Sequence, residues 1–111
     1  MADEKILAAL KKEVGREPVS RQLGLILETV APGQARVRLS TGPQVTNILG
    51  LVHGTAIFAL IDETFQAASN AYGTVAVALN MNLTFHQAPE VGEELQAEAQ
   101  EVHAGTLPRP I

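Results

Sequence analysis

His53, Gly54 and Asp62 are the residues of this sequence whose types and spacing could do chemistry. His53 and Gly54 precede a run of helix-forming residues, and Asp62 follows Gly54 by eight positions. The N-terminus of a helix offers unpaired N–H groups and the positive end of the helix dipole, which together suit an oxyanion. A carboxylate in an apolar wall can act as a general base or a nucleophile. The stretch therefore combines a candidate oxyanion donor with a candidate base.

Each of these residues also has a purely structural interpretation. A His-Gly pair before a helix is often only a tight entry to the first turn, and Asp62 with Glu63 could be the solvated edge of the helix. Perturbed carboxylates also occur in structural networks. Asn47, three positions before Gly50, is typical of a turn. The residue types alone leave both interpretations open.

The element that must position these residues is a helix from Gly54 to about Tyr72. Its side chains are apolar nearly all round, which is typical of a buried helix. About 18 residues at 1.5 Å each give roughly 27 Å, enough to cross a small domain. Consecutive helical positions point about 100° apart, so at most one of Asp62 and Glu63 can easily face a given place.

Hydrophobic periodicity and turn residues predict the remaining elements. The first two strands are expected to form an antiparallel hairpin around Pro32 and Gly33. The predicted segments are an amphipathic helix over 3–14 that ends at Gly15 and Pro18, strands over 23–30, 35–40, 75–85 and 95–102, and an irregular tail over 103–111.

Composition limits the class of protein. With 111 residues, of which 46% are hydrophobic, we expect one globular domain over 1–111, with the N-terminal helix inside 1–20. A net charge of -4 argues against a nucleic-acid partner. The central run is interrupted by polar residues, so no membrane span is expected, and the N-terminus does not resemble a secretory signal. Cytoplasm is the default localisation.

Neither a metal nor a cofactor is expected. The sequence has no cysteine, and its three histidines lie on separate predicted elements without a second nearby ligand. Motifs for nucleotide loops, zinc proteases and serine nucleophile elbows are also missing from the sequence.

The segment from Asn47 to Asp62 reads N-x-x-G-x-x-H-G-x-x-x-x-x-x-x-D. This pattern resembles the signature of hotdog-fold acyl-CoA thioesterases of the phenylacetate-pathway type, and the likeness covers about Leu23 to Val102. The resemblance implies an α+β fold in which an antiparallel sheet wraps a long central helix. It also implies a homodimer or homotetramer and an acyl-CoA substrate.

The resemblance also implies roles for individual residues. Asp62 matches the carboxylate that acts as nucleophile or general base, and the N–H of Gly54 matches the donor that polarises the thioester carbonyl. Asn47 matches the residue that positions the water or the thioester. Glu63 matches no functional position.

The substrate-binding residues implied by the same resemblance are His53, Thr55 and Phe58. His53 matches the histidine that shapes the loop beside the glycine. Thr55 is a departure, because the family usually has a second glycine there. Because Gly54 and Asp62 are about 12 Å apart along one helix, we further expect each active site to be built from two subunits.

A second departure concerns the end of the chain. Residues 103–105 resemble the start of a turn into two more strands, but the sequence stops at Ile111. In the family those strands lie between the strands expected at 95–102 and 75–85, so a gap in the sheet is predicted here. The alternative to an active thioesterase is therefore a truncated, catalytically weak relative that binds acyl groups or partners. A hotdog dehydratase is disfavoured because that family's pairing of a His with an acid is not visible.

Overall fold

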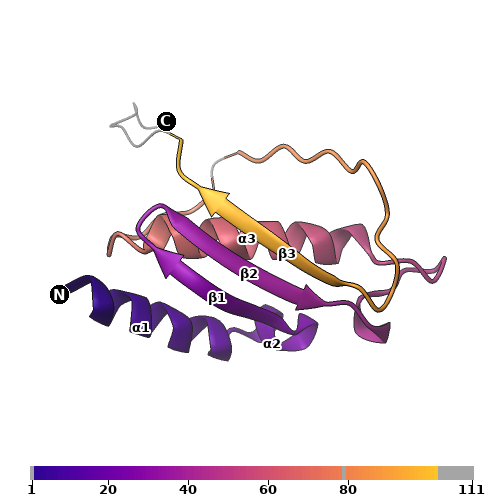
Figure 1. The fold of residues 1–111 in the computed structure, drawn as a ribbon, viewed down its shortest axis with the longest axis horizontal. Helices are drawn as coiled ribbons and strands as arrows, with labels where there is room; N and C mark the ends of the chain where they lie inside the picture. The colour runs from indigo at the N-terminus through magenta and orange to yellow at the C-terminus, as the bar shows by residue number, and fades with distance from the viewer. Residues whose placement is uncertain (1, 79, 103–111) are drawn as a thin grey trace.

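The computed structural model describes residues 2–78 and 80–102 (Figure 1). A long helix lies on one face of a small antiparallel sheet, and two N-terminal helices lie beside the first strand. In chain order the elements are α1 (Ala2–Arg16), α2 (Pro18–Leu23), β1 (Leu25–Ala31), β2 (Gln34–Ser40), the 3-10 turn η1 (Pro43–Val45), α3 (Gly54–Asn70) and β3 (Glu94–Gln100).

The N-terminal segment forms two helices where the sequence predicted one. Helix α1 continues to Arg16, and Pro18 occupies the first turn of α2, a position where its missing N–H costs nothing. Gly24 ends α2 with a φ of 82° and donates its N–H to the carbonyl of Ser20 at 2.8 Å. Strand β1 consequently begins at Leu25, two residues later than expected. Val14 and Ser20 are buried and anchor the two helices.

The hairpin predicted around Pro32 and Gly33 is confirmed. Strand β1 pairs antiparallel with β2, and β2 pairs antiparallel with β3, which gives the order β1-β2-β3. The side chains of β2 alternate as the sequence indicates, with Val37 and Leu39 fully buried toward α3. Strand β3 is also confirmed, ending at Gln100 rather than at residue 102.

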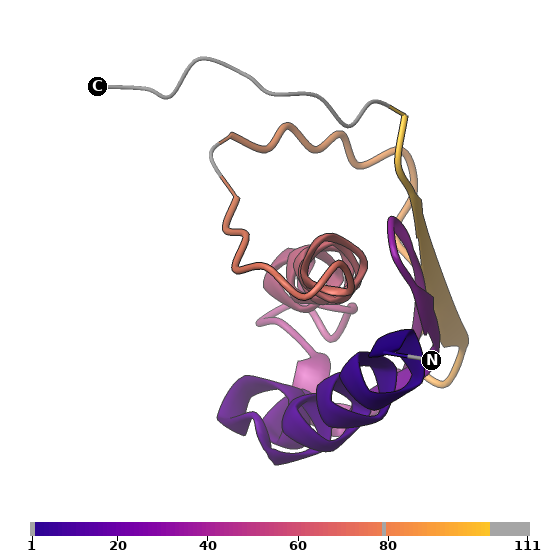
Figure 2. The same ribbon diagram turned by 90° about the vertical axis from the view of Figure 1, so that its left-hand side faces the viewer.

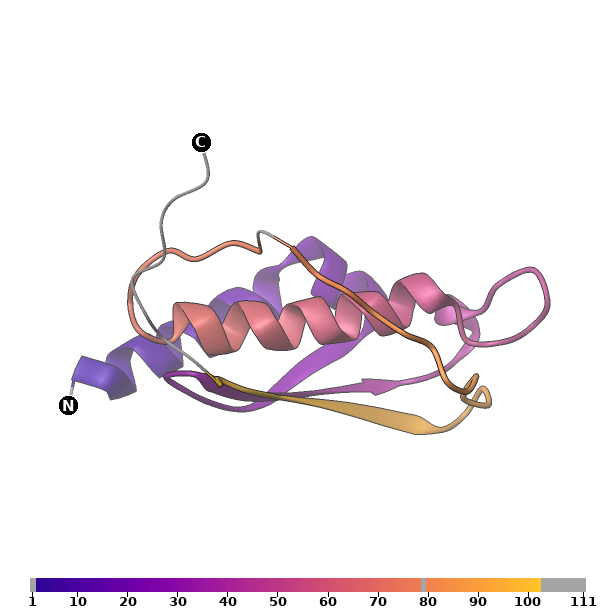
Figure 3. The same ribbon diagram turned by 90° about the horizontal axis from the view of Figure 1, so that it is seen from above.

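Helix α3 packs one face on the sheet and leaves the opposite face open. Figure 2 shows the helix end-on beside the sheet, and Figure 3 shows it running along the strands. The buried positions share one side of the helix; they are Ala56, Leu60, Glu63, Thr64, Ala67 and Ala68. Phe58, on the other side, is 40% exposed. The expectation of a helix buried on every side is therefore wrong for the described part of the chain.

The strand predicted over 75–85 is not formed. The described residues of 74–90 have neither helix nor strand structure, and they pass round α3 on the side away from α1 and α2 (Figure 2). A strand requires an edge whose N–H and C=O groups it can pair with. The described residues offer none here, because no strand lies between this segment and β3. Among residues 2–78 and 80–102, β3 therefore has no strand on its other side, and Val75 and Val77 are 92% and 81% exposed. The tail expected over 103–111 lies outside the described residues.

Candidate active site

His53 fixes the start of α3 as its N-cap. Its backbone is extended, with φ of -68° and ψ of 134°, and its Nδ1 accepts a hydrogen bond from the N–H of Thr55 at 3.0 Å. The ring therefore caps one of the N–H groups that a helix start leaves unpaired. Because Nδ1 is the acceptor, the proton of the neutral ring lies on Nε2. The His-Gly pair thus forms a tight entry to the first turn of the helix, which agrees with the structural interpretation of this pair.

Gly54 has an N–H without an acceptor among the described residues. The next three N–H groups are used: that of Thr55 by the His53 ring, and those of Ala56 and Ile57 by the His53 carbonyl at 3.0 and 3.3 Å. Phe85 lies against Gly54, since a Cβ at this position would be 3.4 Å from the ring Cζ. An unpaired N–H at the positive end of a helix remains available to polarise a carbonyl oxygen.

Asn47 holds the loop that leads into the helix. Its side-chain Oδ1 accepts hydrogen bonds from the N–H groups of Leu49 and Leu51 at 2.9 and 3.1 Å, and its own N–H donates to the Leu51 carbonyl. The turn interpretation of this residue is therefore correct within one chain. The side-chain oxygen is engaged in the loop, so only the Nδ2 amide hydrogens are left for a substrate or a water.

Asp62 lies half-buried on the outward side of α3. Thr55, Phe58 and Asp62 are three and four positions apart, so they share one helix face, opposite the buried positions Ala56 and Leu60. The predicted substrate-binding residues Thr55 and Phe58 are thus brought onto the same face as Asp62. Gly54 and Asp62 are eight positions apart on this helix, about 12 Å along its axis, so one chain does not bring the two together.

Glu63 is the titratable residue that sequence reasoning missed. Its residue exposure is only 6%, so the solvated-edge interpretation is wrong for it. Burial raises the pKa of the Glu63 carboxyl to about 8, helped by a hydrogen bond with the Glu17 carboxyl and by the negative charges of Glu17 and Asp62. The signal was present in the sequence, because position 63 falls on the same side of the helix as the apolar residues that face the sheet.

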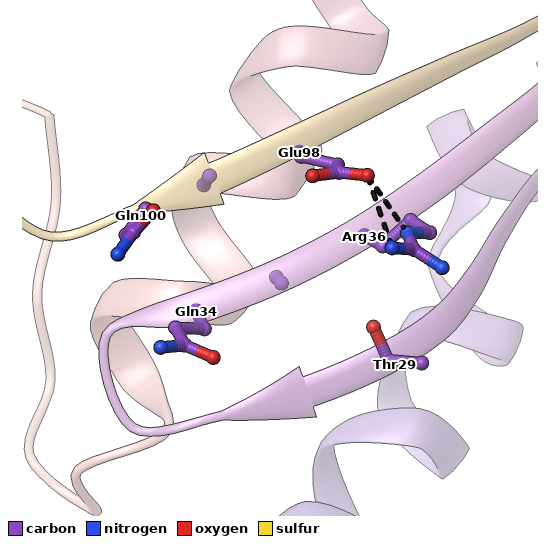
Figure 4. Close-up of a pocket in the computed structure, with 7 residues that line it drawn as sticks. Thr29, Gln34, Arg36, Glu98 and Gln100 are labelled. Carbon is purple, nitrogen blue, oxygen red and sulfur yellow. Dashed lines mark hydrogen bonds and ion pairs between the residues drawn. The ribbon is translucent and has the colours of Figure 1, made fainter.

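Hollows elsewhere on the surface carry less chemistry. A polar hollow of about 350 Å³ lies on the outer face of the sheet, and Arg36 pairs there with Glu98 at 3.0 Å. Figure 4 shows this pair, with Thr29 nearby. The cation of this hollow is already paired, and α3 lies on the other face. Two apolar hollows of about 360 and 500 Å³ lie between α3 and β3, and none of the predicted site residues lines them. Their apolar lining is Ile57, Leu60, Ile61, Leu95 and Ala97 in one, and Phe65, Ala68, Ala99 and Val102 in the other.

Comparison with known proteins identifies the family. The model of the thioesterase superfamily matches residues 49–107, more than half of the chain. The chain belongs to the thioesterase superfamily. The computed structure superimposes on that of the Escherichia coli PaaI protein from the phenylacetic acid degradation operon with a TM-score of 0.85. That comparison has 27% identity and covers 93% of this chain and 75% of the other. The hotdog-like fold expected from the sequence is thereby confirmed.

Two curated relatives of this chain are named "Putative esterase". The one from Archaeoglobus fulgidus is 38% identical over 73 residues, which is 66% of this chain and 47% of the relative. The one from Deinococcus radiodurans is 35% identical over 83 residues, 75% of this chain and 56% of the relative. The chain therefore spans about half the length of the curated relatives it matches.

Two further observations concern the part of this superfamily chain that the structure describes. No helix there is long and apolar enough to cross a membrane. No group of three His, Cys, Asp or Glu side chains within it is placed to hold a metal ion.

Proposed function

We propose that the protein is an acyl-CoA thioesterase in which Asp62 acts as general base or nucleophile and the N–H of Gly54 polarises the thioester carbonyl. The observation that carries this proposal is the N–H of Gly54 at the start of α3, which has no acceptor within residues 2–78 and 80–102, in a chain of the thioesterase superfamily. Asp62, on the open face of the same helix, is accessible to an acyl group or a water in a way that the buried Glu63 is not.

The reaction is hydrolysis of a thioester. In the general-base form, Asp62 takes a proton from a water whose oxygen attacks the carbonyl carbon, and the carbonyl oxygen becomes an oxyanion held by the Gly54 N–H. The C–S bond then breaks, and the thiolate of coenzyme A leaves and takes up a proton. In the nucleophilic form, the Asp62 carboxylate attacks first, and water hydrolyses the resulting anhydride. Both forms yield a carboxylic acid and a free thiol.

Both groups must lie within about 3 Å of the reacting atoms, whereas one helix separates them by about 12 Å. We therefore propose that Gly54 and Asn47 of one subunit face Asp62 of a second copy across a two-fold axis. The exposed apolar side chains on the loop before α3 and on residues 74–90 support such an association. They include Ile48, Leu49, Val75 and Val77, each at least 74% exposed.

Release of free thiol from a panel of acyl-CoAs tests the proposal. Asp62→Asn keeps the shape of the side chain but can neither attack nor accept a proton, so thiol release should fall by about 10²- to 10⁴-fold. Glu98→Gln, on the outer face of the sheet, is the matched control and should keep the wild-type rate. A near wild-type rate in Asp62→Asn would remove this residue from the mechanism.

The second candidate function is acyl-group binding without turnover. The observation that favours it is the pair of apolar hollows between α3 and β3. Equilibrium binding of acyl-CoAs to the wild-type protein, with no thiol released over hours, would establish this function in place of hydrolysis.

A further inference from the structure

Gln66 joins α3 to the corner between the two N-terminal helices. Its Nε2 donates one hydrogen bond to Glu17 Oε2 at 3.0 Å and one to Glu63 Oε1 at 3.4 Å. Glu17 is 49 positions from Gln66 and is the residue that separates α1 from α2. Its backbone is fixed on both sides, since its N–H donates to the Val14 carbonyl and its carbonyl accepts from the Arg21 N–H. The amide therefore bridges two carboxyl groups on separate elements.

The other oxygen of each carboxyl lacks a donor. While both carboxyls are ionised, Glu17 Oε1 and Glu63 Oε2 are buried and accept no hydrogen bond from the described part of the chain; the hydrogen bond between the two carboxyls exists only when one of them carries a proton. Two ionised carboxylates placed together and short of donors would repel each other and leave buried oxygens unsatisfied. One proton between the two carboxyls removes one charge and gives both oxygens a partner, as in the carboxyl pairs that share a proton.

No cation of the described residues compensates this pair. On α1, Glu13 and Arg16 line the adjoining hollow, but they are exposed and pair with each other at 3.8 Å. On α2, Arg21 is exposed, and no ion pair within the described residues joins it to Glu17 or Glu63. On α3 the nearest charge is that of Asp62, which adds to the negative potential at Glu63. The surroundings thus favour the state in which one proton is retained.

We propose that Glu17, Glu63 and Gln66 form a clasp, held by one shared proton, that positions the turn of α3 carrying Asp62 against the corner between α1 and α2. The part of this inference that concerns Asp62 rests on the proposed function. Glu63 is a positioning residue here, because it acts through its neighbour. Loss of the shared proton leaves two buried negative charges side by side, which opens the clasp and releases that turn of the helix.

The pH dependence of unfolding tests the clasp without any reference to activity. The pKa of Glu63 is about 8 in the folded protein against an ordinary value of 4.5, so between these pH values the folded state holds one more proton than the unfolded state. The contribution of Glu63 to the free energy of unfolding is therefore fully present below pH 4.5, and it decreases as the pH rises to about 8. The unfolding constant gains up to about tenfold per pH unit in that window.

Urea unfolding across pH 5 to 9 should show this slope in the wild-type protein and in Glu13→Gln, an exposed acid on the neighbouring helix. Glu63→Gln supplies a neutral side chain of the same shape that can donate to Glu17 at every pH, so its curve should lack the one-proton slope. In Glu17→Gln the amide removes the opposing charge, and the slope should end at a lower pH. A Glu63→Gln curve parallel to that of the wild type would overturn the shared proton.

Two measurements test whether the clasp positions Asp62. Above about pH 8, kcat for thiol release should fall in the wild type but not in Glu63→Gln, and KM should change little in either protein. The uncatalysed hydrolysis of the thioester at alkaline pH is subtracted from both rates. Amide hydrogen exchange over residues 61–65, corrected for its intrinsic pH dependence, should accelerate above pH 8 in the wild type alone. If the unfolding slope is lost in Glu63→Gln while kcat and exchange match the wild type, the positioning role is refuted. If no variant releases thiol, the proposed function fails, and unfolding and exchange still decide the clasp.

Discussion

At the scale of single residues, Asp62 and Glu63 show how one helix gives two neighbouring carboxyls different chemistry. Consecutive positions point about 100° apart, so Asp62 lies on the open face while Glu63 turns toward the buried side. Burial and the Glu17 carboxyl raise the pKa of Glu63 to about 8. An acid that remains protonated at neutral pH is a poor base, whereas an accessible carboxylate can accept a proton. The different environments of the two side chains agree with the roles that we propose for them.

Gly33 and Gly50 offer a matched test of crowding. Their φ angles are 78° and 77°, a region that costs a residue with a side chain about 1 kcal/mol or more. A Cβ on Gly33 would lie 2.8 Å from the Tyr72 hydroxyl oxygen and 3.1 Å from Glu101 Cβ, whereas a Cβ on Gly50 meets nothing within 4 Å. Gly33→Ala should thus lower the free energy of unfolding by about 1–3 kcal/mol more than Gly50→Ala, measured by urea titration.

Tyr72→Phe provides the control for this prediction. Removing the hydroxyl takes away the nearest atom and also the hydrogen bond from Tyr72 to the Glu101 carboxylate. In the Tyr72→Phe background, Gly33→Ala should cost less than it does in the wild-type protein. Equal costs in both backgrounds would show that the Tyr72 hydroxyl does not crowd Gly33.

At the scale of elements, the N-cap of α3 is a testable source of stability. His53→Ala removes the acceptor of the Thr55 N–H, so the free energy of unfolding should fall by about 1 kcal/mol. His53→Asn supplies another side chain that caps helices well and should recover most of that loss. Thermal or urea unfolding of the three proteins checks this, and equal stability of the Ala and Asn variants would contradict it.

The N–H of Gly54 can be deleted without removing the helix start. Proline is accepted in the first position of a helix, and His53 has the extended backbone that a residue before proline requires. Gly54→Pro should therefore fold and lose about 10²- to 10³-fold in kcat for thiol release, because the oxyanion loses its donor. Gly54→Ala keeps the N–H and places a Cβ at ordinary contact with Phe85, so it should retain most activity. Equal losses in the two variants would point to crowding instead.

Most elements were predictable because periodicity and turn residues act locally. The alternation in β2 and β3 and the turn at Gly33 come from neighbouring residues, and so does the helix that begins at Gly54. The local pattern does not distinguish the two uses of Pro18, because proline ends one helix and also starts the next one well. The helical position of Glu63 indicates its burial, but its partner Glu17 is far away in the sequence, so local patterns could not supply that partner.

The segment 75–85 differs from the strand that its sequence predicts for another reason. Its alternating and β-branched residues have the composition of a strand, but strand structure needs a paired edge from elsewhere. Within the described chain that edge is missing, so Val75 and Val77 remain exposed. The role proposed for Asp62 has a similar limit, because one chain does not bring this carboxylate to the N–H of Gly54.

At the scale of the whole molecule, the proposed shared site predicts that two inactive variants restore each other. Gly54→Pro lacks the oxyanion donor and Asp62→Asn lacks the base, so each homodimer should be inactive. After joint unfolding and refolding in equal amounts, about half of the dimers are mixed. Each mixed dimer has one site with both defects and one site with the wild-type Gly54 and Asp62. About a quarter of wild-type thiol release should then return. Mixing without unfolding is the control, and a site contained in one chain would recover nothing.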